Sequence, residues 1–122
     1  MISGSINSDP EPIICVEVRG PSTARVVEKI LDTGFNGSLT LPASVIQALA
    51  LQLHGREAAE LADGSAEVFD VYLAEVVWSN TTRSIQVQEA NAQPLLGMDL
   101  LLGHDVLLRV AVGGQVTVTP TI

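Results

Sequence analysis

Short apolar runs separated by turn residues follow one another along most of the chain, and this pattern constrains the fold more than any other feature of the sequence. Ile13–Arg19 and Ala24–Leu31 have the branched composition of strands and flank the turn sequence Gly-Pro-Ser-Thr. Asp63-Gly64 is a strong hairpin dipeptide, and Gly113-Gly114 separates the last two strand-like runs. The sequence therefore predicts about seven strands, joined mainly by tight turns.

Two segments have helical spacing. Apolar side chains fall on one helical face within Ala43–Leu53, which follows Pro42 and which Gly55 is expected to end. A second, shorter helix is expected within Pro94–Asp105, where Gly103 closes it. We therefore expect an all-β chain with one or two short helices.

The composition indicates an aliphatic core in a single domain. Hydrophobic residues make up 47% of the 122 residues but aromatic residues only 3%, so Val, Leu, Ile and Ala must fill the interior. Residues 1–12 are rich in Ser, Gly, Asn and Pro, and we expect them to form a flexible N-terminal arm. The domain itself is expected to span residues 13–122.

Charge and cysteine content exclude several classes of function. Fourteen acidic residues against six basic ones give a net charge of -8, which argues against nucleic acid as a partner. The single cysteine, Cys15, rules out an internal disulfide and a cysteine-rich metal site, and we expect it to be a small buried hydrophobe. No apolar stretch is long enough to span a membrane, so we expect a cytoplasmic protein without membrane contact.

One acidic residue stands where an apolar strand is expected to end. Asp32-Thr33-Gly34 follows Lys-Ile-Leu, Ser38 lies six residues past the acid, and a second apolar pair followed by glycine occurs at Leu95-Leu96-Gly97. Aspartate, threonine and glycine are ordinary turn residues, so the triplet alone can be explained as a tight turn. Its combination with the later Leu95-Leu96-Gly97 motif indicates a catalytic site.

The order of these motifs resembles the retropepsin type of aspartic peptidase, and the Asp-Thr-Gly-Phe sequence resembles still more closely its bacterial single-domain relatives, the DTGF group of clan AA. The resemblance covers about Ile13 to Ile122. It implies an all-β, retropepsin-like closed barrel of about seven strands, aspartic endopeptidase activity on polypeptides, and no cofactor or metal. In such enzymes a water molecule lies between two carboxylates that share a proton.

The sequence supplies only one acid of this kind. The second catalytic carboxylate must therefore be Asp32 of another copy, which predicts a homodimer with the site on its two-fold axis. The alternating C-terminal run Gln115–Ile122 is the segment expected to form a sheet between subunits, as chain ends do in retropepsins.

The resemblance assigns roles to the neighbouring residues. Asp32, Thr33 and Gly34 would be catalytic, with the Thr33 hydroxyl on the partner's backbone and Gly34 leaving room for close approach. A mobile hairpin would close over the peptide. The residues implied to contact substrate are Phe35, Asn36, Ala62, Asp63, Gly64 and Ser65, and those implied to support the loop are Ser38, Leu95, Leu96 and Gly97.

The chain departs from the retroviral pattern at a charged pair that braces the catalytic loop. The positions of its acid and its arginine are occupied by Asn36 and Met98, so the sequence indicates a different brace. Phe35 replaces a small residue and can either form a subsite wall or fill the cleft. Asp99, just after Gly97, is interpreted as a helix cap or dipole partner.

Two other functions remain open from the sequence. A catalytically weak or inactive peptide-binding or scaffold module would keep the fold without turnover. A metal-dependent hydrolase would need His54 or His104, which have no ligand-type spacing and are expected in surface loops.

Overall fold

The computed structural model describes residues 1–121, and it is mostly β, with 56% of residues in strands and 8% in helices. The two short helices are α1 (Ala43–Ala48) and α2 (Met98–Leu101). The ten strands are β1 (Ile2–Ile6), β2 (Pro12–Arg19), β3 (Ala24–Leu31), β4 (Leu39–Leu41), β5 (Gln52–Glu60), β6 (Ala66–Trp78), β7 (Thr81–Glu89), β8 (Leu95–Leu96), β9 (His104–Leu108) and β10 (Gln115–Pro120).

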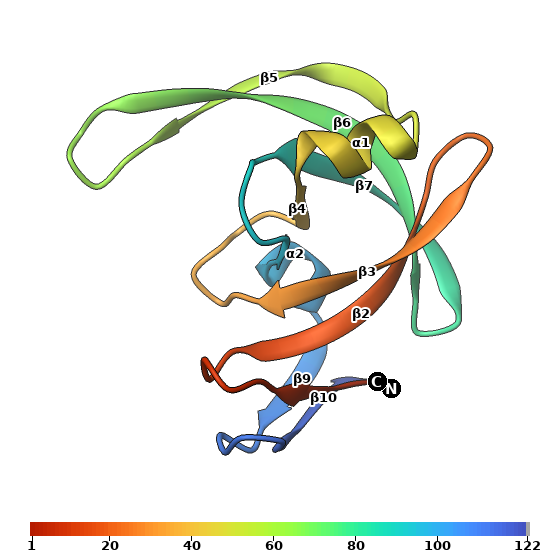
Figure 1. The fold of residues 1–122 in the computed structure, drawn as a ribbon, viewed down its shortest axis with the longest axis vertical. Helices are drawn as coiled ribbons and strands as arrows, with labels where there is room; N and C mark the ends of the chain where they lie inside the picture. Colours follow the sequence, from red (N-terminus) through yellow and green to blue (C-terminus); the bar gives the residue numbers. More distant parts are fainter. Residues whose placement is uncertain (122) are drawn as a thin grey trace.

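The strands form one strongly curved sheet in the order β5-β6-β7-β4-β8-β3-β2-β1-β10-β9. An additional pairing of Val18 and Arg19 in β2 with Val76 and Glu75 in β6 turns the middle of this sheet into a partial ring (Figure 1). The hairpins predicted at Gly20–Thr23, Asp63-Gly64 and Gly113-Gly114 are confirmed. The expected strand count was too low, because β1, β5 and β8 were not anticipated as separate strands.

The expectation of a flexible arm over residues 1–12 is wrong for its first half. Ile2–Ile6 form β1, which pairs with β10 on one side and with β2 on the other, and the Ile6 side chain is buried. Consequently β10 lies between β1 and β9 within one chain. Both of its edges are occupied, so the C-terminal run Gln115–Ile122 is not free to form the expected sheet between subunits over its described residues.

The helix expected over Ala43–Leu53 is shorter than predicted. It ends at Ala48, with Leu49 as its C-cap, and Ala50 then takes a left-handed conformation at φ 50°. From Gln52 the chain continues as β5, because the antiparallel ladder that this nine-residue strand forms with β6 outweighs the helical spacing of the apolar side chains. No helix within residues 1–121 is long and apolar enough to cross a membrane.

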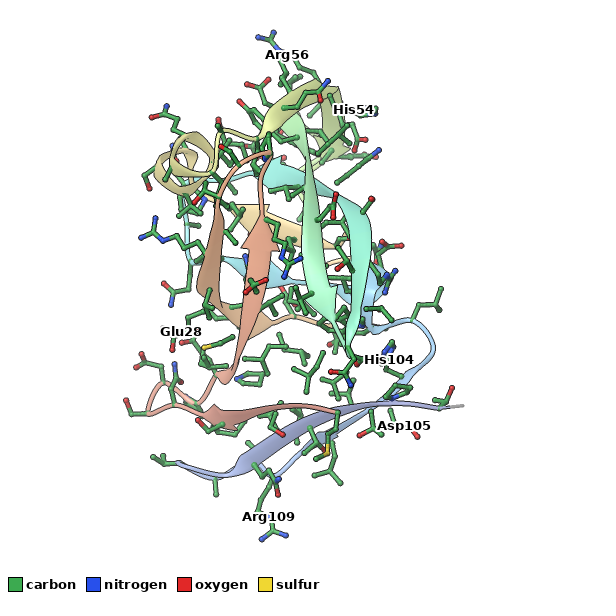
Figure 2. All side chains as sticks on the ribbon, turned by 90° about the vertical axis from the view of Figure 1, so that its right-hand side faces the viewer. Glu28, His54, Arg56, His104, Asp105 and Arg109 are labelled. Carbon is green, nitrogen blue, oxygen red and sulfur yellow. The ribbon has the colours of Figure 1, made fainter. Side chains whose placement is uncertain are left out.

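Side chains alternate between the two faces of β2 and β3. Ile14, Val16 and Val18 are buried, whereas Cys15 is exposed, so the expectation of a buried cysteine is wrong. Cys15 pairs with Glu28 on β3, and Glu28 points away from the core (Figure 2). Because successive residues of a strand face opposite sides, burying the valines of this run exposes its cysteine.

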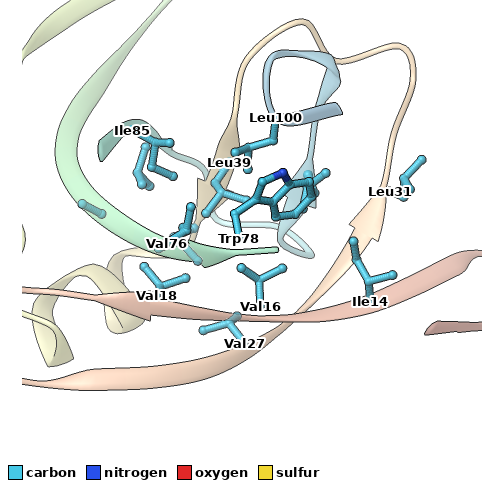
Figure 3. Close-up of a cluster of buried hydrophobic side chains, with 14 of the residues drawn as sticks. Ile14, Val16, Val18, Val27, Leu31, Leu39, Val76, Trp78, Ile85 and Leu100 are labelled. Carbon is cyan, nitrogen blue, oxygen red and sulfur yellow. The ribbon is translucent and has the colours of Figure 1, made fainter. Parts of the chain in front are cut away.

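The core is aliphatic, as the composition predicts, and it is built around one aromatic side chain. Trp78 at the end of β6 is 2% exposed and packs among side chains from both halves of the sheet (Figure 3). Leu100 of α2 belongs to the same cluster, so the short helix closes one side of the core. The ends of β3 and β8, at the Asp32-Thr33-Gly34 and Leu95-Leu96-Gly97 motifs, are therefore anchored in the packed core.

Candidate active site

Asp32 directly follows the last residue of β3 in the middle of the sheet. Its backbone N–H donates a 2.9 Å hydrogen bond to the carbonyl oxygen of Leu96, which extends the parallel pairing of β3 with β8 by one residue. Asp32 is partly exposed, whereas Leu31 and Leu96 are buried. The carboxylate thus stands at the end of an interior strand, on a backbone that is hydrogen-bonded up to the acid itself.

The turn after Asp32 is closed by its own side chain. Oδ1 of Asp32 accepts a 2.8 Å hydrogen bond from the N–H of Gly34, and the Asp32 carbonyl oxygen accepts one of 3.2 Å from the N–H of Phe35. A Cβ atom on Gly34 would lie 3.2 Å from Oδ1 of Asp32, a tight contact. Thr33 and Gly34 are exposed, which leaves both accessible to another molecule.

The loop from Phe35 to Ser38 is fastened to the start of α2. The N–H groups of Gly97, Met98 and Asp99 donate to the carbonyl oxygens of Ser38, Phe35 and Gly37 at 2.9, 2.8 and 3.2 Å. The hydroxyl of Ser38, which is 7% exposed, donates a 2.6 Å hydrogen bond to Oδ2 of Asp99. Two segments that are distant in sequence are therefore held together by main-chain and side-chain bonds.

Phe35 lies against the glycines of this junction. A Cβ atom on Gly97 would meet the Gly37 carbonyl oxygen at 2.3 Å and Cδ2 of Phe35 at 2.5 Å, and one on Gly37 would meet Cζ of Phe35 at 2.6 Å. The ring is partly buried on the loop's own backbone. Because it has no side chain, Gly97 permits the close approach of the Gly37 backbone and of the Phe35 ring.

Leu95 and Leu96 lie behind the Asp32 loop as β8. This short strand is parallel to β3 on one side and pairs Leu96 with Leu39 of β4 on the other. The N–H of Leu95 donates a 2.8 Å hydrogen bond to Oγ1 of Thr40, which is buried. Leu95 and Leu96 thus connect β3, the strand before Asp32, to β4.

Ala62–Ser65 form the tip of the long β5–β6 hairpin, which projects from the body of the sheet (Figure 1). Gly64 adopts φ 85°, and the turn is closed by bonds between the N–H of Leu61 and the Ser65 oxygen and between the N–H of Gly64 and the Leu61 oxygen. The hydroxyl and N–H of Ser65 both donate to Asp63 Oδ1, which lowers the pKa of the Asp63 carboxyl. The tip is fully exposed.

Two cavities border this region, and Asp32 lines neither. One, of about 740 Å³, lies beside the loop and is lined by Asn36, Gly37, Ser38 and Asp99 together with residues of β5, β6 and β7. The other, of about 830 Å³, lies between the β5–β6 hairpin and Gln88–Ala92. Asn36 thus reaches a cavity within the chain, whereas the acid stands outside both.

The positions of three polar residues in or near this region were not predicted from the sequence. Asp99 does not cap α2, whose N-cap is Gly97, but lies in its first turn and accepts the bond from Ser38 of the Asp32 loop. Thr40 is a polar residue in an otherwise apolar strand, and its hydroxyl accepts a hydrogen bond from β8. Lys29 is completely buried in β3, three residues before Asp32, and its Nζ has no hydrogen-bond partner within residues 1–121. Thr40 and Lys29 could have been recognised as polar residues at inward positions, but no local signal pairs Ser38 with Asp99.

The histidines lie in strands and not in the expected loops. His54 belongs to β5, while Nε2 of His104, at the start of β9, accepts a 3.2 Å hydrogen bond from Nε1 of Trp78 (Figure 2). Within the described residues, no group of three or more His, Cys, Asp or Glu side chains is placed to hold a metal ion.

Neither a protein-family model nor a curated protein matches this chain. Its own residues must therefore carry any functional conclusion.

Proposed function

We propose that this protein is a retropepsin-like aspartic endopeptidase, in which two Asp32 carboxylates, one from each subunit of a homodimer, activate a water molecule. The observation that carries the proposal is the setting of Asp32. Asp32 directly follows the interior strand β3 and accepts a hydrogen bond from the N–H of Gly34. It lies on a loop that is hydrogen-bonded to β8 and α2. A tight surface turn would not require this anchoring.

Peptide hydrolysis by this mechanism requires two Asp32 carboxylates. Two carboxylates about 3 Å apart cannot both ionise easily, so the pair retains one proton. The ionised member accepts a proton from water as its oxygen attacks the peptide carbonyl carbon, and the protonated member donates a hydrogen bond to the carbonyl oxygen. The tetrahedral intermediate then collapses with cleavage of the C–N bond, and the carboxyl group that took the proton from water gives it to the leaving nitrogen, which restores the singly protonated pair.

The exposure of Asp32 supports a site completed by a second copy. Asp32 is partly exposed and lines neither of the two cavities described above, while Thr33 and Gly34 beside it are exposed. A two-fold axis beside this loop would bring two identical acids together without any further residue. Thr33 would then meet the partner's loop.

The exposed hairpin and the loop favour an extended polypeptide as substrate. The tip at Ala62–Ser65 has no element packed over it in Figure 1, and Asn36 lines the cavity beside the loop. In our proposal the hairpin folds over a bound peptide and excludes water from the two carboxylates. Phe35 and Asn36 would contact the peptide near its scissile bond.

A cleavage assay with a charge-removing variant tests the proposal. The purified protein should cleave unfolded or extended peptides at mildly acidic pH, and a statine-type inhibitor should block cleavage. Asp32→Asn should abolish activity without unfolding the chain, whereas Asp9→Asn, at an exposed aspartate of the β1–β2 turn, should retain it. Cleavage that persists in Asp32→Asn would contradict the proposal, and peptide binding without cleavage by the unaltered protein would favour the binding module.

A further inference from the structure

The strand β9 ends the sheet and leaves one edge uncovered. Its inner edge pairs with β10 over five residue pairs, from Val116 with Leu108 to Pro120 with His104. No other strand within residues 1–121 pairs with its outer edge. An uncovered edge presents a row of backbone donors and acceptors that a further strand can use.

One face of β9 carries an exposed apolar residue, Leu107, between two opposite charges. Leu107 is 57% exposed, and Asp105 and Arg109 lie on either side of it. These residues occupy the same face of the strand, opposite the one on which Val106 packs against the core. Neither Asp105 nor Arg109 forms an ion pair within the described part of the chain, and both are labelled at the lower end of the molecule in Figure 2.

The hydrogen bonds to β10 determine which residues of β9 can bond to a new neighbour. The N–H of Arg109 donates to the Gln115 oxygen, and the Gly103 oxygen accepts from the N–H of Thr121, so odd-numbered residues are directed toward β10. In an antiparallel ladder the intervening residues are directed to the other edge. Val106 and Leu108 therefore present their N–H and C=O groups outward.

We infer that β9 pairs antiparallel with β9 of a second copy, with Leu107 on the two-fold axis. In this register Val106 of each chain exchanges hydrogen bonds with Leu108 of the other, and the two Leu107 side chains meet as a non-hydrogen-bonded pair. Asp105 then faces Arg109 of the second copy, and the symmetry repeats this contact on the other side of the axis.

Charge complementarity selects this register from its neighbours. With the axis at Val106, Asp105 would face Leu107 of the other chain, and with the axis at Leu108 it would face Ala111. In both alternative registers Asp105 does not face Arg109 of the other chain. The register centred on Leu107 pairs the two charges of one chain with the two of the other. A second copy of this chain is therefore the partner whose own charges match the edge.

This pairing goes beyond the proposed function and connects to it through α2. Only Leu102 and Gly103 separate α2 from β9, and Asp99 in α2 holds the Asp32 loop through Ser38. A β9 ladder across the axis would fix the position of α2 and, with it, the loop that bears the acid. Only this consequence rests on the proposed peptidase function, because the pairing itself depends on β9 alone.

Cysteine cross-linking tests the register directly. In a Cys15→Ser background, Leu107→Cys should form a disulfide-linked dimer at micromolar concentration under mild oxidation, because cysteines that face each other in a non-hydrogen-bonded pair approach disulfide geometry. The matched control is Leu53→Cys, which is similarly exposed, at 55%, on the strand at the other end of the sheet. Absence of a cross-link at Leu107, or equal cross-linking at both positions, would overturn the inference.

Charge reversal provides a second test in solution. Asp105→Arg and Arg109→Asp, made singly, should each raise the dimer dissociation constant at least about tenfold in sedimentation equilibrium, and the double reversal should restore it. Trp78 fluorescence verifies that each variant is folded. Single reversals without effect, or a double reversal that restores nothing, would refute the pairing. A β9-linked dimer that cleaves no peptide would contradict the proposed function and leave the pairing intact.

Discussion

Ser38 Oγ donates a 2.6 Å hydrogen bond to Asp99 Oδ2, and this side-chain contact adds to the main-chain bonds that link the Asp32 loop to α2 across 61 residues of sequence. Under the proposed function, this bond would replace the charged pair that the retroviral pattern would place at Asn36 and Met98. A hydrogen bond from a buried hydroxyl to a carboxylate holds the loop without an ion pair. The stability of the loop therefore depends on a donor and an acceptor that can each be removed.

Ser38→Ala should lower the free energy of unfolding by about 1–3 kcal/mol, because the hydrogen bond from its buried hydroxyl to the charged, exposed Asp99 carboxylate is lost. Asp99→Asn should cost less, since its amide oxygen can still accept from the hydroxyl. Urea denaturation followed by the fluorescence of Trp78, the only tryptophan, measures both changes. Equal stability of Ser38→Ala and the unaltered protein would show that the contact is not a brace.

Gly97→Ala should destabilise the protein by more than about 2 kcal/mol, because its new Cβ atom would lie 2.3 Å from the Gly37 carbonyl oxygen and force the loop away from α2. Gly55→Ala is the matched control, as no atom lies within 4 Å of a Cβ atom there. Thermal unfolding of the two variants separates a steric effect from a general effect of replacing glycine. Similar melting temperatures for both would contradict the close crossing.

Lys29→Met should stabilise the protein in a pH-dependent way. Burial lowers the pKa of the Lys29 ammonium from 10.5 to about 7, so below pH 7 the folded chain must hold a buried charge. At about 1.4 kcal/mol per unit, this shift corresponds to about 5 kcal/mol of stability that is lost below pH 7 and regained as the pH rises toward 10.5.

The gain from Lys29→Met should therefore be greatest below pH 7 and decline up to pH 10.5, as measured by urea denaturation across this range. Arg25→Met, on the same strand but exposed, should show no such trend. A gain that is the same at pH 6 and pH 10 would show that Lys29 keeps its charge throughout.

The sequence predicted those parts of the fold that local patterns determine. Apolar and polar residues alternate clearly in β2, β3 and β10, and the dipeptides Asp63-Gly64 and Gly113-Gly114 strongly favour hairpin turns. β1 was missed because Ser3, Gly4 and Ser5 have low strand propensity, and its pairing with β10 and β2 decides its conformation instead. The early end of α1 has a similar cause in the ladder between β5 and β6.

The candidate site was predicted only in part. The sequence identified Asp32 and the later Leu95-Leu96-Gly97, and the structure places them on adjacent strands. The Ser38–Asp99 bond and the position of the Phe35 ring arise from contacts between distant segments, which no local pattern encodes. The buried Lys29 opposes the ordinary preference of charged side chains for water, so its inward position was not expected.

Subunit mixing tests most directly the claim that two chains share one catalytic site. Unaltered protein is unfolded and refolded together with increasing amounts of Asp32→Asn, and cleavage is measured per unaltered subunit, with Asp9→Asn as the control. If each site needs two Asp32 carboxylates, a ninefold excess of Asp32→Asn should reduce that activity to about one tenth, because most unaltered chains then lie in inactive mixed dimers. Activity per unaltered subunit that stays constant at every ratio would contradict the shared site.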